Sequence, residues 1–192
     1  MLGVNLVLFT QRRDDYRWRV DMLDIGHGLA IVIERAGKAI IFDTGNRWRT
    51  GSMAATVILP YLRWRGIVVE QIILSHDHLD HTGGLAELKA AFPQAKVRAP
   101  FSLTGLIADL PCQQGVKWQW QGLNFDVLWP RTQVINAQNN DSCVIRIDDG
   151  QQSLLLTGDL ETQGERLLVK NHRAKLASTL LQVPHHGSNT SS

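Results

Sequence analysis

Six consecutive positions, from His76 to His81, hold three histidines and two aspartates. Imidazole nitrogens and carboxylate oxygens are ligands that zinc and similar divalent cations prefer. Side chains that alternate along a sharp loop can turn toward a common point, so we expect His76 and His78 to bind one ion. Asp80 and His81 then face a second ion. Histidines and aspartates also collect in solvated loops that bind nothing, but this group follows an expected core strand, which favours a preorganised metal site.

Two later apolar runs end in the same kind of residue. Residues 154–157 lead to Asp159, and an aspartate at that point can bridge two cations. Residues 181–183 lead to the pair His185 and His186. A single aspartate at a strand end is more often a turn or cap residue. Together with the first cluster, however, these residues indicate one shared site.

Three further polar positions are given structural roles. Asp43 follows the apolar run Ile40-Ile41-Phe42, and we expect it to hold a ligand loop by hydrogen bonds rather than to bind metal directly. His27 lies in a glycine-rich turn and is expected to be exposed. His172 is expected to be a solvated residue near a helix end.

Composition fits one domain. The 192 residues, 44% of them hydrophobic, are enough to bury a core. A net charge of +2 neither favours nor excludes an acidic partner. Cys112 and Cys143 lack the CxxC spacing of zinc ligands; two small buried side chains are favoured over one disulfide.

The N-terminal residues have a different character. Residues 2–9 are apolar and are followed at once by Arg12 and Arg13. A membrane span needs roughly 20 apolar residues, so this run alone cannot cross a bilayer. It also lacks the basic start and the cleavage site of a secretory signal. We therefore expect residues 1–16 to be the stub of an upstream membrane segment with a linker, and residues 17–192 to form the domain.

Strands and helices are expected to place these residues at the edges of sheets. Alternating and apolar runs bounded by glycines predict strands at residues 18–25, 30–34, 39–43, 68–74, 97–100, 123–129, 143–147, 153–157 and 180–183. Helices are expected at residues 53–65, 85–91, 103–110 and 161–169. Strands flanked by helices predict an α+β domain with sheets inside and helices outside.

The motifs together resemble a known family. His-x-His-x-Asp-His after a strand, the later Thr157-Gly158-Asp159 and a final strand-end histidine are similar to the metallo-β-lactamase superfamily, whose fold is a four-layer αββα sandwich. Within it, the chain resembles the extracytoplasmic domain of ComEC-type DNA-uptake channels. The segments that carry this likeness are Leu23 to Gly28, Phe42 to Gly45, Leu156 to Glu161 and Val183 to Ser188.

The resemblance implies a role for each residue. His76 and His78 would bind one metal, Asp80 and His81 a second, with Asp159 as the bridge and His185 as the later ligand. Asp80 would also take part in catalysis, and His186 would contact the scissile phosphate. The cofactor would be a pair of divalent ions, zinc or manganese.

The chain departs from the family pattern in two ways. The superfamily usually supplies one more histidine to the first metal, and none occurs between Thr82 and Gly158. Asp141 or a water would have to fill that position. The chain also stops soon after His186, whereas the family's domain continues, so we expect a sandwich truncated at its C-terminus.

A repeated basic-aromatic-basic triplet points to nucleic acid. It occurs at residues 17–19, 47–49 and 63–65. Arginines neutralise phosphates and tryptophans stack on unpaired bases, which suits single strands. The alternative is that each tryptophan is a core residue flanked by solvated charges. Residues Arg47, Trp48 and Arg49 are the best candidates for DNA contacts, because they follow the Asp43 loop.

Three functions are compatible with these residues. A pair of divalent ions activates water and clamps both oxygens of a displacement, which suits hydrolysis. The favoured hypothesis is a phosphodiesterase that attacks single-stranded DNA with metal-bound hydroxide during DNA uptake. Its partners would be DNA and the membrane channel of the same parent protein, in the bacterial inner membrane, with this domain on the periplasmic side. The alternatives are a hydrolase of small thioesters, lactones or lactams, and a non-catalytic DNA-binding module with an incomplete metal site.

Overall fold

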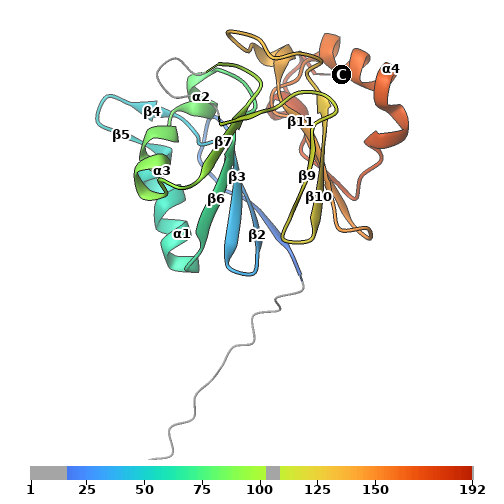
Figure 1. Cartoon of the computed structure of the whole chain (residues 1–192). Coiled ribbons are helices and arrows are strands. Elements are labelled where there is room, and N and C mark those ends of the chain that lie inside the picture. The colour runs from blue at the N-terminus through green and yellow to red at the C-terminus, as the bar shows by residue number, and fades with distance from the viewer. Residues whose placement is uncertain (1–16, 103–108, 192) are drawn as a thin grey trace, which may run out of the picture.

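The computed structural model describes residues 17–102 and 109–191, which form two facing sheets flanked by helices (Figure 1). The first sheet has six strands in the order β1-β2-β3-β6-β7-β8. They are β1 (Arg19–Met22), β2 (Ile31–Arg35), β3 (Lys38–Phe42), β6 (Val68–Ile73), β7 (Lys96–Ala99) and β8 (Leu110–Pro111). The second sheet has five strands in the order β13-β12-β11-β10-β9. They are β9 (Lys117–Trp120), β10 (Leu123–Trp129), β11 (Val144–Asp148), β12 (Ser153–Leu156) and β13 (Leu180–Leu181).

Helices cover the outer face of each sheet. The π-helical turn η1 (Ala54–Ile58) continues into α1 (Leu59–Arg65), and together with α3 (Leu85–Ala91) it packs on the first sheet. Helix α4 (Thr162–Leu176) packs on the second sheet. The predicted αββα sandwich is therefore confirmed. No helix among the described residues is long and apolar enough to cross a bilayer.

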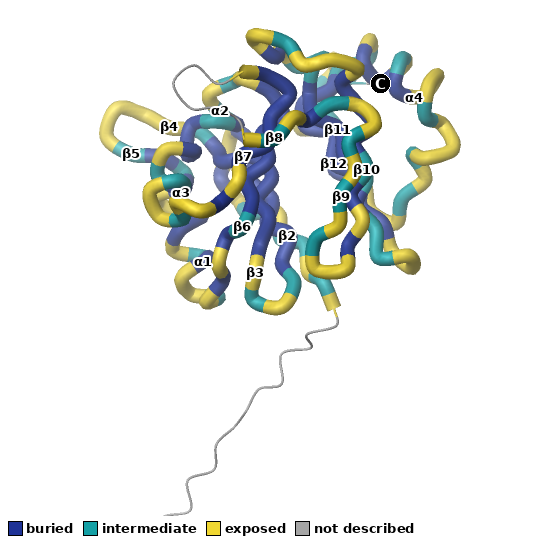
Figure 2. Tube along the Cα trace, viewed as in Figure 1, coloured by how far each residue is buried: buried dark blue, intermediate teal, exposed yellow. Residues whose placement is uncertain are grey.

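Alternation along the strands produces three apolar layers. In β3, Ile40 and Phe42 face the second sheet, whereas Ile41 faces α1 and α3. The layer between the sheets contains Phe125 and Ile145 from the second sheet. The third layer lies under α4. Figure 2 shows that the buried residues follow the strands of both sheets.

The largest differences from the predicted elements lie in short segments. The hairpin of β4 (Arg47–Trp48) and β5 (Gly51–Ser52) is absent from the prediction, and so are β8 and β9. Strands β4, β5 and β8 have two residues each, which is too short to show an alternation. Strand β9 does alternate, with Trp118 and Trp120 facing the core, and the prediction missed it. The predicted helix at 103–110 falls mostly on residues outside those described, and Leu110 pairs in β8. Helix α4 runs past Val169 and bends at His172, whose φ of −132° is not helical.

The interpretation of the two cysteines as separate buried side chains is wrong. Cys112 and Cys143 form a disulfide with a Cα–Cα distance of 5.9 Å. Cys112 follows β8 of the first sheet, and Cys143 precedes β11 of the second. Both side chains are buried between the sheets, so the bond joins the two halves of the sandwich. The sequence separation of 31 residues gives no sign of this proximity.

Candidate metal centre

The loops that carry the candidate ligands meet at one edge of the sandwich. Strands β3 and β6 are parallel, so Asp43 and His76 follow them at the same end of the first sheet. The loop after β12 reaches this edge from the second sheet and carries Asp159. The Ser75 carbonyl accepts a hydrogen bond from Cys143 N at 2.8 Å, which joins the two sheets beside the cluster.

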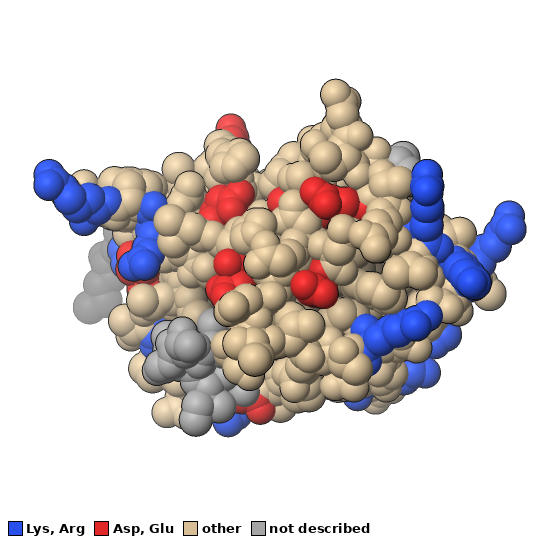
Figure 3. Space-filling view, turned by 90° about the horizontal axis from the view of Figure 1, so that it is seen from above, with Lys and Arg blue, Asp and Glu red and all other residues tan. Residues whose placement is uncertain are grey.

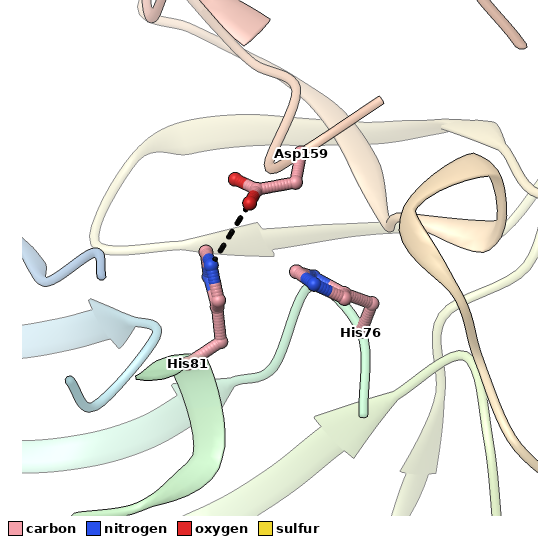
Figure 4. Close-up of side chains that lie close together, drawn as sticks. All are labelled: His76, His81 and Asp159. Carbon is pink, nitrogen blue, oxygen red and sulfur yellow. Dashed lines mark ion pairs between the residues drawn. The ribbon is translucent and has the colours of Figure 1, made fainter. Parts of the chain in front are cut away.

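His76, His81 and Asp159 form the first group of potential ligands (Figure 4). Each offers one ligand atom, and these atoms lie within 4.8 Å of one another. His81 Nε2 is 3.2 Å from Asp159 Oδ2. His76 Nε2 and Asp159 Oδ1 are buried and have no hydrogen-bond partner among the described residues. Because a buried polar atom without a partner is costly, these atoms fit a divalent cation between them.

A second group shares His81 with the first. Asp80, His81 and His186 also place one ligand atom each within 4.8 Å of the others. Asp80 Oδ2 lies 3.6 Å from His81 Nε2, and its side chain is 18% exposed. His186 Nε2 lies 3.4 Å from Asp159 Oδ2, so the two groups adjoin. His81 Nδ1 pairs with Asp43, so only Nε2 is free for a cation, and this nitrogen can bind one ion at a time. Asp159 has two oxygens and is the residue able to bridge neighbouring ions.

Two predicted ligands lie beside these groups. The ring of His78 is 4.5 Å from that of His76, and its Nε2 is 3.4 Å from Gln138 Oε1. His185 Nε2 is 3.9 Å from Asp159 Oδ2, while its Nδ1 pairs with Thr190 Oγ1 at 2.6 Å. The structure thus brings all six predicted ligands to one edge, and it places His186 rather than His185 in the second group. The division of ligands between two ions stays a prediction.

Asp43 holds the ligand loop in place through contacts with Ser75 and His81. Its Oδ1 accepts Ser75 N at 2.7 Å, and its Oδ2 accepts Ser75 Oγ at 2.7 Å. The same Oδ2 lies 2.8 Å from His81 Nδ1, with both side chains fully buried. This carboxylate holds the His81 ring with Nε2 directed at Asp159.

Burial and neighbouring charges set the protonation of the cluster. Burial, followed by repulsion from His81, lowers the pKa of His76 to about 2, so its imidazole is neutral and ready to bind a cation. Burial alone would lower the pKa of His81, but the charges of Asp43 and Asp159 raise it to about 10. Burial opposes ionisation of Asp159, yet its hydrogen bond and attraction to His81 hold the pKa of this carboxyl below its ordinary value. The metal-free site therefore places a proton on His81 where an ion would sit.

The segment that lacks the expected histidine approaches the site through Gln138. Asp141, the predicted substitute, accepts a hydrogen bond from Gln138 N at 3.0 Å and so caps its own 3-10 turn, η2 (Asn139–Asp141). Gln138 Oε1 is the atom of this segment that faces His78. An amide does not stand out in sequence as a substitute ligand, which is why the sequence does not single out Gln138.

His27 also reaches the site. It is exposed, as expected from its turn, but its Nε2 lies 3.1 Å from Asp80 Oδ2. Gly28 makes this possible, because a Cβ there would clash with the Asp80 carbonyl oxygen. The pattern Gly-His-Gly is the only sign of this contact in the sequence.

The three basic-aromatic triplets lie at different edges. Arg47 and Trp48 form β4, and Gly83 of the metal loop lies against Arg47 N, where a Cβ would be at 2.5 Å. Trp18 packs on the core between the sheets and donates a hydrogen bond to Asp149 at 2.9 Å. Trp64 precedes β6 and therefore lies at the opposite end of the sheet from His76. Of the three triplets, the one at residues 47–49 lies next to the metal centre.

Comparison with known proteins decides the family. Residues 23–192 match the model of the metallo-beta-lactamase superfamily. The chain belongs to the metallo-β-lactamase superfamily. Solved metallo-β-lactamases share the fold: SMB-1 bound to 2-mercaptoethanesulfonate gives a TM-score of 0.60 at 14% identity, covering 87% of this chain and 76% of that one. The superfamily and the cluster of histidines and aspartates together indicate a divalent metal site.

Several curated relatives have names connected with competence or recombination. Recombination protein 2 of Haemophilus influenzae is 45% identical over the whole chain, and competence protein ComA of Neisseria gonorrhoeae is 36% identical over 90% of it. ComE operon protein 3 of Bacillus subtilis is 31% identical over 88% of the chain. The chain spans about a quarter of the length of these relatives, 24% of each of the first two and 25% of the third. This metallo-β-lactamase domain therefore resembles one part of a much longer kind of protein.

Proposed function

We propose that this domain is a metal-dependent phosphodiesterase that cleaves single-stranded DNA during DNA uptake. The observation that carries the proposal is the pair of ligand groups that share His81, next to the basic β4–β5 hairpin. Two adjacent cation sites suit phosphodiester hydrolysis, and the names of the competence relatives point to DNA as the substrate.

The residues of the site have distinct tasks in this reaction. Divalent ions held there would lower the pKa of water and offset the charge of the phosphate. Asp43 keeps His81 in position, and His76 binds as a neutral imidazole. Asp80 is partly exposed at the rim and accepts the proton that the attacking water loses. His186, on the outer side of Asp159, would contact an oxygen of the scissile phosphate, which leaves Asp80 and the bridging Asp159 as the protein ligands of the second ion.

The disulfide supports a location outside the cytoplasm. Disulfides form and persist in oxidising compartments such as the periplasm. The competence relatives are about four times as long as this chain, which supports a longer parent protein, and their names suggest that its neighbouring part is the membrane channel for DNA. In that arrangement the domain would act on the strand that is not imported.

The test combines metal content with DNA cleavage. We expect the purified chain to bind two zinc or manganese ions and to cut a fluorescent single-stranded oligonucleotide, with loss of cleavage in EDTA. His81→Ala should lose both ions and all cleavage, because this side chain belongs to both groups. Lys96→Gln, an exposed side chain at the end of β7 opposite to the cluster, is the control and should keep both. Cleavage that survives both His81→Ala and EDTA would contradict the proposal.

A second candidate function is hydrolysis of a small thioester. A hydroxyacylglutathione hydrolase of Stenotrophomonas maltophilia is 30% identical over 65% of this chain and 41% of its own length. Metal-dependent turnover of S-lactoylglutathione with intact DNA would favour this alternative. Absence of turnover on both substrates, with DNA binding unaffected by EDTA, would instead identify a binding module.

A further inference from the structure

Basic side chains flank the metal edge on two opposite sides. Seen from above, the carboxylates lie in the middle of this face, and lysines and arginines project at either side (Figure 3). One side is the β4–β5 hairpin with Arg47 and Arg49. The other side is the region of α4, which contributes no ligand to the metal centre.

The α4 side has unpaired positive charge. Arg166 and Lys170 are one turn apart on the exposed face of α4, and Arg173 follows the bend at His172. Arg131 is exposed just after β10. Within residues 17–102 and 109–191, none of these four side chains forms an ion pair. By contrast, Lys175 on the same helix is paired with Asp126 at 2.9 Å.

A polar pocket adjoins these charges. It has a volume of about 450 Å³ and is lined by Gln114, Arg131, Asn171 and His172. The lining offers a guanidinium, two side-chain amides and an imidazole, and it contains no carboxylate. Hydrogen-bond donors with positive charge and no competing acid are the chemistry that binds a phosphate group.

One lining residue of the pocket, Arg131, lies at the same edge of the second sheet as the metal centre. Strand β10 is antiparallel to β11, and β11 is antiparallel to β12, so β10 and β12 end together. Arg131 follows β10, as Asp159 follows β12. Trp129 Nε1 donates to Asn140 O at 2.7 Å, and Asn140 Oδ1 accepts Glu161 N, which links the end of β10 to the Asp159 loop.

We propose that Arg131, Lys170, Arg173 and the adjoining pocket bind the phosphate backbone of single-stranded DNA on the α4 side of the metal centre. This inference rests on the proposed function and adds a path to it: the strand runs from the β4–β5 hairpin, across the ligands, to α4. The carboxylates in the middle repel phosphates, so the strand needs positive charge on both sides of the cleavage point. His172 lies ten residues after Thr162, about 15 Å along the helix axis, so the path spans several nucleotides.

The experiment measures DNA binding without turnover. Fluorescence anisotropy with a labelled oligo-dT in EDTA gives the affinity of the full chain at several salt concentrations. For Arg131→Glu/Lys170→Glu we expect about tenfold weaker binding, and a log K against log salt slope that is shallower by about 1.4, since each contact with a single strand contributes about 0.7. The control Arg63→Glu/Lys96→Glu changes the net charge equally at the opposite edge and should leave the slope unchanged. Equal effects of the two variants, or no effect of the first, would overturn the inference.

Two further measurements separate this inference from the proposed function and from a lipid partner. Metal-loaded Arg131→Glu/Lys170→Glu should hydrolyse bis(4-nitrophenyl) phosphate like the unmodified chain, because this small ester does not reach α4. If the unmodified chain lacks hydrolysis but the binding difference persists, the proposed function fails and the DNA path stands. Unchanged DNA binding with lost binding to phosphatidylglycerol vesicles would identify α4 as a membrane contact and overturn the inference.

Discussion

The two parts of the metal centre differ in how far their ligands are buried and fixed by neighbouring side chains. The half from the first sheet, His76 and His81, is fully buried and braced by Asp43 and Ser75. The half from the end of the chain includes His185 and His186, which lie on an open turn with φ values of 46° and 54°. Left-handed backbone at residues other than glycine costs free energy. We call His76 and His81 the firm half of the site. His185 and His186 are the loose half, because they are more exposed and lie on a strained turn.

The largest effect on stability is expected from Asp43, which holds His81 in the firm half. Asp43→Asn should lower the free energy of unfolding by about 3–5 kcal/mol, because it removes one of the two buried carboxylates that pair with His81. Asparagine tolerates the φ of 60° at this position, so the backbone is not the cause. Urea unfolding gives the value. Asp77→Asn removes an exposed charge in the same loop and should cost under about 0.5 kcal/mol. Similar losses of unfolding free energy in the two variants would show that the buried pair of Asp43 and His81 does not stabilise the chain more than an exposed charge does.

Stability of the metal-free chain and its affinity for zinc should depend on pH in opposite directions, because both depend on the proton of His81. The pKa of His81 is raised to about 10 from about 6.5, so its contribution to the stability of the metal-free chain is complete below pH 6.5 and is lost as the pH rises to 10. Metal binding at Nε2 must displace the same proton, so zinc affinity should rise about tenfold per pH unit between pH 7 and 9. Competition with a chromophoric chelator measures this affinity. A zinc affinity that is flat over this range would mean that His81 is already neutral.

The smallest effect is expected from the turn of the loose half. His185→Gly should be about 1 kcal/mol more stable than His185→Ala, since glycine adopts a φ of 46° without strain. Thermal unfolding of the metal-free variants compares them directly. Equal stability would show that this turn is already free to relax. The pair also tests function, because both variants lack the imidazole and should lose metal affinity equally.

The sequence predicted the position of each candidate ligand better than the contacts between loops. The cluster from His76 to His81 is contiguous and comes after a strongly apolar strand, so its place at a sheet edge was evident. The contact of His27 with Asp80 depends on two loops that cross, and the approach of Gln138 depends on the path after β10. The Cys112–Cys143 bond likewise joins two sheets whose proximity is a tertiary property. Local patterns indicate a strand and the residues directly after it, whereas contacts between loops depend on the assembled sandwich.

The close approach of the two sheets at Gly158 limits how this domain can change over evolution. A Cβ at position 158 would lie 2.7 Å from the Ser75 Cβ and 3.1 Å from the Ser142 Oγ. Ser75 contacts Asp43 and His76 at the same time, so it cannot withdraw to make room. In a library of random variants, positions 75 and 158 should therefore accept almost no replacement, whereas exposed residues of α4 should accept many. New substrates would be acquired through changes in α4, while the contact between the two sheets at Gly158 stays the same.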